Sequence, residues 1–287
     1  MIKLIAIDLD GTLLNSTGNI SERNRQAILK AQEKGIEVVV ATGRSFESAN
    51  RPIKEAEIVC PKICVNGAEI YQENHKKLSS ITMSKENIAK IIAITELHGA
   101  YLEIYTNKGI FAKQQNEILE ILVNAIRSNH PELSEAEVQK RVNQRFQEES
   151  FLFVDSFSSI LNDPTIEIVK ALALCFDPQK LTTIKTALAN EAELLITSSG
   201  FDNLEFNHPN AQKGIALEKF AQKRKITKEQ IMAIGDNEND LSMLKYAGTS
   251  VAMANAKESI KPLVDHITTS NDQDGVALAI EAILNQN

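Results

Sequence analysis

The sequence predicts an α/β protein with a doubly wound, Rossmann-like core built on a parallel sheet, and an α+β domain inserted into that core. Two observations predict the core. Short apolar runs that do not alternate with polar residues recur towards both ends of the chain, which is typical of parallel strands buried on both faces. Helical patterns separate these runs, as in doubly wound sheets. A third observation predicts the insertion, because hairpin-like segments replace this pattern between residues 83 and 208.

The first part of the core contains buried strands and one clear helix. The first expected strand covers residues 3–8. Ser21 is a favourable N-cap, and the helix that follows it is expected to run to Lys34, with Gly35 just beyond its end. Asn66-Gly67 is a turn signal, after which two strands are expected to pair as a hairpin. The other strands expected in this part are 36–41, 62–65, 69–72 and 77–82.

The inserted segment mixes helices with strands. Ser84 is expected to cap a helix that ends at Gly99, and Ser134 with Glu137 forms a capping box at the start of another. Two further helical patterns cover about 119–126 and 179–191. The strands expected here are 101–105, 110–112, 151–154, 166–176, 194–197 and 203–206. This mixture is typical of an α+β domain.

The pattern of buried strands returns after the insertion. One helix is expected from Lys213 to about Arg224, a second from Asn239, and a last one that ends near Leu284. The strands between them are 231–234, 250–252 and 266–268. We therefore expect a discontinuous core, 1–82 with 209–287, and an inserted domain, 83–208.

The composition excludes several classes of function. The chain has 287 residues, and 31 Lys and Arg against 38 Asp and Glu give a formal net charge of −7. No basic block offers a surface for nucleic acid, and no apolar run approaches the roughly 20 residues of a membrane helix. Asp8 and Asp10 interrupt the first apolar run, so we expect no signal peptide and a reduced, cytoplasmic protein. The expected partner is a small molecule, and monomer and homodimer stay open.

Acidic residues follow the strands of the predicted core. The first strand leads into Asp8-Leu-Asp-Gly-Thr-Leu13, the second into Thr42-Gly-Arg44 and a later one into Gly235-Asp-Asn-Glu-Asn-Asp240, while Lys213 begins a helix. The carboxyl ends of these strands are expected around one crevice, at the switch point of the sheet. Carboxylates gathered there raise each other's pKa, so a bound cation is expected. Ligands that are all oxygen favour Mg²⁺.

These four segments, in this order, resemble the four motifs of the haloacid dehalogenase (HAD) superfamily of phosphotransferases. The long insertion between the second and third motifs resembles the Cof-type branch, which carries a large type IIB cap. Asn66-Gly-Ala68, Asp274-Gly-Val276 and residues 251–256 are also Cof-like. The resemblance spans the core and is diffuse in the insertion, particularly at 113–160. It implies that the insertion is a cap that closes over the crevice, excludes water and contacts the leaving group.

The resemblance also implies a role for each motif residue. Phosphoryl transfer needs a nucleophile and charge neutralisation. Asp8 would be the nucleophile that forms an aspartyl-phosphate, and Asp10 would protonate the leaving group and later accept a proton from water. The metal would be held by Asp8, by Asp236 and by the backbone carbonyl of Asp10. The implied phosphate-binding residues are Leu9, Thr42, Gly43, Lys213 and Asn239.

Simpler interpretations exist for several of these residues. Asp8 and Asp10 could belong to an ordinary turn after a strand, and Lys213 could be a solvated lysine in the first turn of a helix. The presence of all four motifs in order favours the active site. Asp240 is expected to orient its neighbours, although it and Asn239 could also cap the following helix. For Arg44 two interpretations stay open, which are contact with the substrate or cap and pairing with a carboxylate.

The sequence therefore predicts a hydrolase, namely a Mg²⁺-dependent phosphatase. Its expected substrates are small phosphorylated metabolites, either sugar phosphates or nucleotide and cofactor phosphates. The resemblance excludes a dehalogenase, because relatives with that activity lack the acid at the position of Asp10. A phosphomutase or phosphotransferase with the same intermediate is one alternative. A non-catalytic regulator that binds phosphorylated metabolites is another, which the loss of Asp10 or Lys213 would have favoured.

Overall fold

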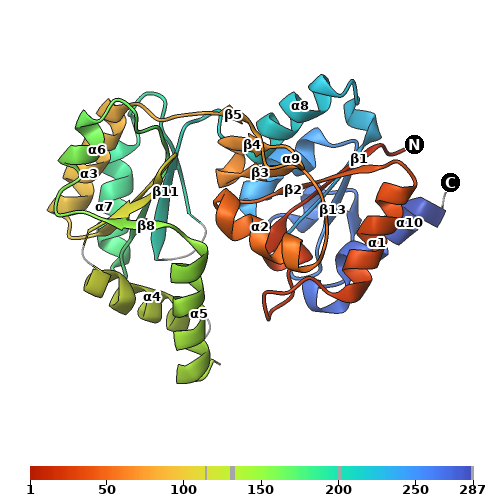
Figure 1. Ribbon diagram of the computed structural model, residues 1–287, viewed down its shortest axis with the longest axis horizontal. Coiled ribbons are helices and arrows are strands. Elements are labelled where there is room, and N and C mark those ends of the chain that lie inside the picture. Colours follow the sequence, from red (N-terminus) through yellow and green to blue (C-terminus); the bar gives the residue numbers. More distant parts are fainter. Residues whose placement is uncertain (114, 130–132, 199–201, 286–287) are drawn as a thin grey trace. The chain divides into compact units, whose positions relative to one another are not determined.

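The computed structural model describes residues 1–113, 115–129, 133–198 and 202–285. The chain divides into two compact units (Figure 1). The core unit consists of Met1–Ser80 and Asn210–Asn287, and the inserted unit consists of Ile81–Pro209.

The described part of the core unit contains an eight-stranded sheet in the order β14-β13-β12-β1-β2-β3-β4-β5. The strands from β14 to β3 are parallel, and β4 and β5 extend one edge as an antiparallel hairpin. In the middle of the sheet, Leu4 of β1 lies between Glu37 and Ile231. The strands are β1 (Leu4–Ile7), β2 (Glu37–Ala41), β3 (Lys62–Cys64), β4 (Glu69–Tyr71), β5 (Lys77–Ser80), β12 (Ile231–Gly235), β13 (Thr249–Ala252) and β14 (His266–Ile267).

Helices cover both faces of this sheet, with α8 and α9 on one face and α1, α2 and α10 on the other (Figure 1). All four residues of β1 are buried, as expected of a strand covered on both sides. The predicted doubly wound parallel sheet is therefore confirmed. The helices are α1 (Glu22–Glu33), α2 (Phe46–Glu55), α8 (Lys213–Lys223), α9 (Leu241–Tyr246) and α10 (Gly275–Asn285).

The described part of the inserted unit contains a six-stranded sheet in the order β10-β11-β9-β6-β7-β8. Its neighbours are antiparallel except β7 and β8. Apolar residues of α3 and α7 pack with residues of this sheet in a separate hydrophobic core, which gives the predicted α+β architecture. The elements are α3 (Lys85–Leu97), β6 (Tyr101–Thr106), β7 (Gly109–Ala112), α4 (Gln115–Asn129), α5 (Glu135–Glu148), β8 (Phe151–Phe153), α6 (Ser158–Asn162), β9 (Ile168–Leu174), α7 (Pro178–Leu188), β10 (Leu195–Thr197) and β11 (Asn203–Asn207).

Several elements differ from the sequence prediction. The sequence analysis did not identify α2 or the short α6. The helix expected from Asn239 begins at Leu241, because a 3₁₀ turn over Glu238–Asp240 precedes it. The helix expected over 179–191 begins at Pro178, since Asp177 accepts hydrogen bonds from the amides of the first turn, and it ends at Leu188.

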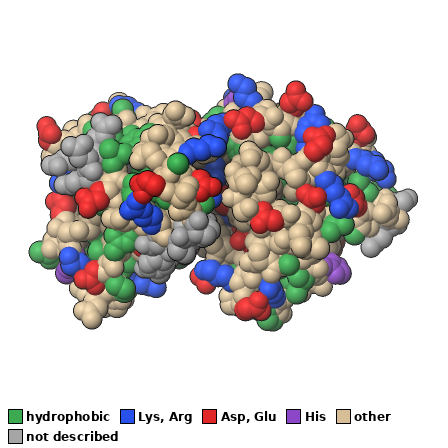
Figure 2. Space-filling model, turned by 90° about the horizontal axis from the view of Figure 1, so that it is seen from below, with side chains coloured by type: hydrophobic (Ala, Val, Ile, Leu, Met, Phe, Trp, Pro, Cys, Tyr) green, Lys and Arg blue, Asp and Glu red, His purple; other side chains and the backbone are tan. Residues whose placement is uncertain are grey.

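Charged side chains of both signs are interspersed on the molecular face of Figure 2, and the hydrophobic side chains there form small separate groups. This mixture accords with the modest net charge of −7. Within the described ranges, none of the helices combines the length and the apolar character that a membrane crossing requires.

Candidate active site

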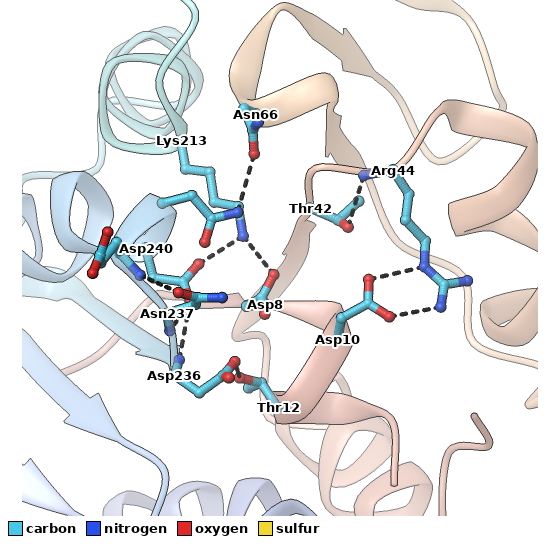
Figure 3. A network of polar contacts seen from close by, with 12 residues as sticks. Asp8, Asp10, Thr12, Thr42, Arg44, Asn66, Lys213, Asp236, Asn237 and Asp240 are labelled. Atoms are coloured by element: carbon cyan, nitrogen blue, oxygen red, sulfur yellow. Dashed lines mark hydrogen bonds and ion pairs between the residues drawn. The ribbon is translucent and has the colours of Figure 1, made fainter. Parts of the chain in front are cut away.

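The four motif segments meet at one edge of the core sheet (Figure 3). Asp8 follows β1, Thr42 follows β2 and Asp236 follows β12, while Lys213 is the first residue of α8. The strands β12, β1 and β2 are parallel neighbours, so their carboxyl ends lie side by side. The topology therefore explains why residues far apart in the sequence share one site.

A wide turn over Leu9–Leu13 follows Asp8 and contains Asp10, the second aspartate of the first motif. The amide of Leu13 donates to the Asp8 carbonyl at 3.2 Å, and that of Leu14 donates to the Leu9 carbonyl at 2.8 Å. Gly11 has a φ of +73°, and a Cβ atom there would lie 2.5 Å from Asp236 Oδ2, so the position requires glycine. Because of this turn, Asp8 is 4% exposed whereas the Asp10 side chain is 56% exposed.

Lys213 lies at the centre of the buried charges. Its Nζ atom donates to Asp8 Oδ1 at 2.5 Å and to Asp240 Oδ1 at 2.6 Å. A cation at a helix N-terminus opposes the helix dipole, and burial by itself lowers the pKa of a lysine. The charges of Asp240 and Asp8 outweigh that burial and raise the pKa of Lys213 above its usual value. Lys213 is therefore a fixed positive charge.

Asp240 holds several of its neighbours at once. Beyond its contact with Lys213, its second oxygen accepts from the backbone amides of Asp236 and Asn237, each at 2.9 Å. Both of its oxygens are thus engaged by the protein. This pattern is that of a carboxylate that orients Lys213 and the Asp236 backbone.

One carboxylate oxygen of each of Asp8, Asp236 and Asp240 lies within 4.8 Å of the others. Because both Asp240 oxygens accept hydrogen bonds from the protein, Asp8 and Asp236 are the carboxylates of this group that could hold a metal ion. Burial, and then the charge of Asp240, raise the pKa of Asp8 well above its usual value. The same two causes raise the pKa of Asp236 to about 6. Three carboxylates face one lysine, so the cluster carries excess negative charge, and its donors are all oxygen. The residues present therefore fit Mg²⁺.

The Asp10 side chain is not part of this acidic group. Figure 3 shows it facing Arg44, whose Nη2 and Nε atoms donate to the two Asp10 oxygens at 2.6 and 2.9 Å. Of the two interpretations of Arg44 that the sequence left open, this structure contains the pairing with a carboxylate. The contact is bidentate, the most specific geometry between these groups.

The remaining predicted phosphate-binding residues lie along the same edge. Thr42 is fully buried, and its Oγ1 accepts from the Arg44 amide at 3.1 Å, which leaves the hydroxyl proton for another acceptor. The Leu9 side chain is buried in the core, so only its backbone could contact a phosphate. Asn239 Nδ2 donates to Asn66 Oδ1 at 3.1 Å.

Sequence reasoning did not assign two asparagines that support the site. The sequence indicates only a turn and a Cof-like segment at Asn66, and the contact of Asn66 with Asn239 joins segments distant in sequence. Asn255 donates from Nδ2 to the Gly11 carbonyl at 2.8 Å and thereby holds the turn after Asp8. The only signal for either was its place in a Cof-like segment.

The fold and this arrangement of residues define the chain as an α/β protein that has a discontinuous core, an inserted unit and an acidic site at the carboxyl ends of the core strands. A family model described as haloacid dehalogenase-like hydrolase matches residues 5–280. The chain belongs to this family, in the Cof-type branch, as the sequence predicted. It is an enzyme, a phosphoric monoester hydrolase.

Individual relatives agree with this assignment. Phosphatase YwpJ of Bacillus subtilis is 34% identical over 99% of this chain and 100% of its own length. A second B. subtilis protein, 5-amino-6-(5-phospho-D-ribitylamino)uracil phosphatase YwtE, is 33% identical over 99% of this chain and 98% of its own. A solved structure of a haloacid dehalogenase-like hydrolase from B. subtilis superposes with a TM-score of 0.88 at 34% identity, and the match covers 98% of this chain and 99% of that chain.

Proposed function

We propose that this chain is a Mg²⁺-dependent phosphatase that hydrolyses small phosphorylated metabolites through an aspartyl-phosphate on Asp8. The observation that carries the proposal is the buried Asp8 carboxylate, which Lys213 contacts at 2.5 Å beside Asp236. A buried carboxylate fixed in this way is a poor structural element and a well-placed nucleophile.

In the first step, an Asp8 oxygen attacks phosphorus and the bond between phosphorus and the leaving oxygen breaks. Lys213 lowers the repulsion between the attacking carboxylate and the anionic phosphoryl group. Asp240 keeps Lys213 in place through its 2.6 Å contact. Four groups hold the phosphoryl oxygens, namely the Thr42 hydroxyl, the backbone amides of Leu9 and Gly43, and the Asn239 carboxamide.

The magnesium ion would be held by Asp8, Asp236 and the backbone carbonyl of Asp10. When bound, it neutralises negative charge on the phosphoryl oxygens and on the acidic group. Thr12 donates to Asp236 Oδ1 at 2.8 Å and so restricts the orientation of that ligand.

Asp10 is the acid and base of the reaction. It protonates the leaving oxygen in the first step and then accepts a proton from the water that attacks the aspartyl-phosphate. The proton that Asp10 gives up in the first step is regained from the attacking water in the second, so the residue returns to its starting form after each turnover. The bidentate contact with Arg44 holds its carboxylate in one orientation in the free enzyme.

The proposed substrates are sugar phosphates or nucleotide and cofactor phosphates. The name of the B. subtilis relative YwtE describes a phosphate ester on a ribityl chain that is joined to a uracil ring. Such a compound combines a polyol phosphate with a heterocycle, and we include it among the candidate substrates of this chain.

The test is a panel of phosphorylated metabolites in which released phosphate is measured with Mg²⁺ and with a chelator. We expect turnover that requires Mg²⁺ and that falls by ~10³-fold or more in Asp8→Asn, because the nucleophile is lost. Asp155→Asn is the matched control, since Asp155 is an exposed aspartate of the inserted unit. Undiminished turnover in Asp8→Asn would refute the mechanism. Isomerised product without free phosphate would instead indicate a phosphomutase.

A further inference from the structure

The turn that follows β3 contacts two of the four motif segments, although it belongs to none of them. Its residues Val65 and Asn66 have φ values of +50° and +54°. This left-handed region is unfavourable for a branched residue such as valine, whereas asparagine adopts it more readily. A strained conformation persists only where contacts with the surrounding structure hold it in place. The contacts of this turn therefore indicate which part of the site it supports.

The backbone of the turn holds the second motif. The amide of Val65 donates to the Arg44 carbonyl at 2.9 Å, and the amide of Asn66 donates to the Thr42 carbonyl at 3.0 Å. These two hydrogen bonds lie on either side of Gly43, whose backbone amide is one of the groups proposed to donate a hydrogen bond to the phosphate. A Cβ atom at Gly43 would lie 2.9 Å from Asn66 Oδ1, so the Asn66 side chain lies directly against this backbone.

The Asn66 side chain also contacts the fourth motif. Its Oδ1 atom accepts from Asn239 Nδ2 at 3.1 Å, and Asn66 as a whole is 6% exposed. The other end of the Asn239 carboxamide is a buried Oδ1 atom that finds no hydrogen-bond donor among the described residues. A buried acceptor without a donor is costly and marks a place where a ligand or water completes the bonding.

We propose that Asn66 is a positioning residue of the active site, an inference that rests on the proposed function. Its carboxamide takes one proton of Asn239 Nδ2 and so fixes the plane of the Asn239 side chain. The second Nδ2 proton and the Oδ1 atom of Asn239 then have set directions, one towards a phosphoryl oxygen and the other towards a water. Through the same turn, Asn66 keeps the Gly43 amide at a constant distance from Asn239.

The test is a double-mutant cycle of Asn66→Gly with Asn239→Ala. Glycine accepts the left-handed backbone, so Asn66→Gly removes the side chain and keeps the turn. With p-nitrophenyl phosphate and Mg²⁺, we expect each single variant to lower kcat/KM by about tenfold. We expect kcat/KM of the double variant to be no lower than that of the less active single variant, because Asn66 acts through Asn239. Lys225→Gly is the control, as Lys225 has a φ of +57° at an exposed position after α8.

A second measurement makes the test independent of turnover. The affinity for inorganic phosphate with Mg²⁺ is expected to fall about tenfold in both single variants and no further in the double variant. If the wild-type protein binds phosphate but does not hydrolyse the ester, the proposed function is refuted. The phosphate affinities of the variants then still test the role of Asn66. Wild-type values in Asn66→Gly, losses that multiply in the double variant, or a loss of folding in Asn66→Gly would each overturn the role of Asn66.

Discussion

At the scale of single residues, charge imbalance dominates the site. Three carboxylates, those of Asp8, Asp236 and Asp240, lie around the single ammonium group of Lys213. Burial, and then the charge of Asp240, raise the pKa values of Asp8 and Asp236, because ionising either carboxyl group adds charge of the same sign to a buried cluster. Proteins retain such an arrangement where a cation or a reaction uses it.

This imbalance predicts how Mg²⁺ stabilises the protein at different pH values. The pKa of Asp236 is about 6 in the metal-free protein, above its ordinary value of 3.8. A raised carboxyl pKa means that the folded state binds this proton more tightly than the unfolded state, so the contribution of Asp236 to the stability of the metal-free protein falls as pH rises from about 4 to 6. Mg²⁺ competes with these protons. We expect the rise in Tm on adding Mg²⁺ to be small at pH 5 and to grow up to about pH 7.

Thermal melts with chelator and with Mg²⁺ across this pH range measure the effect. Asp155→Asn serves again as the control, because it removes a carboxyl group outside the cluster. A shift in Tm that is the same at pH 5 and pH 7 would contradict the prediction. In Asp236→Asn we expect the Mg²⁺-dependent shift to disappear at every pH.

Which motif segments would lie together could be predicted from the sequence, and the contacts between individual side chains could not. Strand ends follow from apolar patterning, and parallel topology then brings Asp8, Thr42 and Asp236 to one edge. The pairing of Asp10 with Arg44 depends on the turn over Leu9–Leu13, which moves Asp10 away from the face that a regular strand would give it. No residue pattern encodes that turn beyond Gly11.

At the scale of elements, α2 shows why helix patterns can be missed. Its buried residues, Ser48, Ala49, Pro52 and Ile53, recur at helical spacing, but only Ile53 is a large apolar residue, and a proline inside the pattern argues against a helix. Pro52 also has no amide proton, which leaves the Ser48 carbonyl without its usual helical donor. Arg44 Nη1 donates to that carbonyl at 3.4 Å. The irregular helix thus contributes to anchoring the arginine that holds Asp10.

Helix boundaries marked by capping residues could be predicted much better. Ser21, Ser84 and Ser134 each accept a hydrogen bond from a backbone amide in the first turn of the helix that follows, as their positions in the sequence indicated. Capping is a local interaction of residues three apart, so the sequence contains nearly all of it. Strand ends in the inserted unit depend on neighbouring strands, and β9 is accordingly shorter than the apolar run of 166–176.

The cap of α1 provides a stability prediction for one element. Ser21 Oγ accepts from the Asn24 amide at 3.1 Å and donates to Asp274 Oδ1 at 2.6 Å, which joins the start of α1 to the residue before α10. Ser21→Ala removes both bonds, so we expect a loss of about 1–2 kcal/mol in the free energy of unfolding with unchanged kcat/KM. Denaturant titration measures it. Lys30→Ala, at an exposed position of α1, is the control and should change stability by less than about 0.5 kcal/mol. Equal stability of the two variants would show that the cap contributes nothing.

At the scale of the whole molecule, the two units differ in how their sheets are assembled from the chain. In the core unit, β1 from the first segment pairs with β12 from the last, so neither segment can form the sheet by itself. In the inserted unit, all described strands of the sheet come from the continuous stretch Ile81–Pro209. We propose that the inserted unit is an independent folding domain and that the core is not divisible.

This proposal can be tested with fragments of the chain. A fragment of residues 81–209 keeps every pairing of the six-stranded sheet, and it keeps a hydrophobic core that includes Ile88, Ile104, Ile184 and Phe206, all fully buried. A core of this kind in a chain of ordinary domain size supports a cooperative fold with a stability of roughly 5 kcal/mol or more. We therefore expect a single cooperative unfolding transition by circular dichroism and dispersed amide resonances by NMR.

The fragment of residues 1–80 is the matched comparison, because it contains β1 to β5 and has lost the pairing of β1 with β12. Its apolar strand residues would lie without α8 and α9, which cover one face of the sheet in the intact core. We expect no cooperative transition in this fragment, and we expect recovery of structure when residues 210–287 are joined to it through a short linker. A folded 1–80 fragment would contradict the indivisible core, because its sheet would then be stable without the pairing of β1 with β12. An 81–209 fragment without a cooperative transition would contradict the independent folding of the inserted unit.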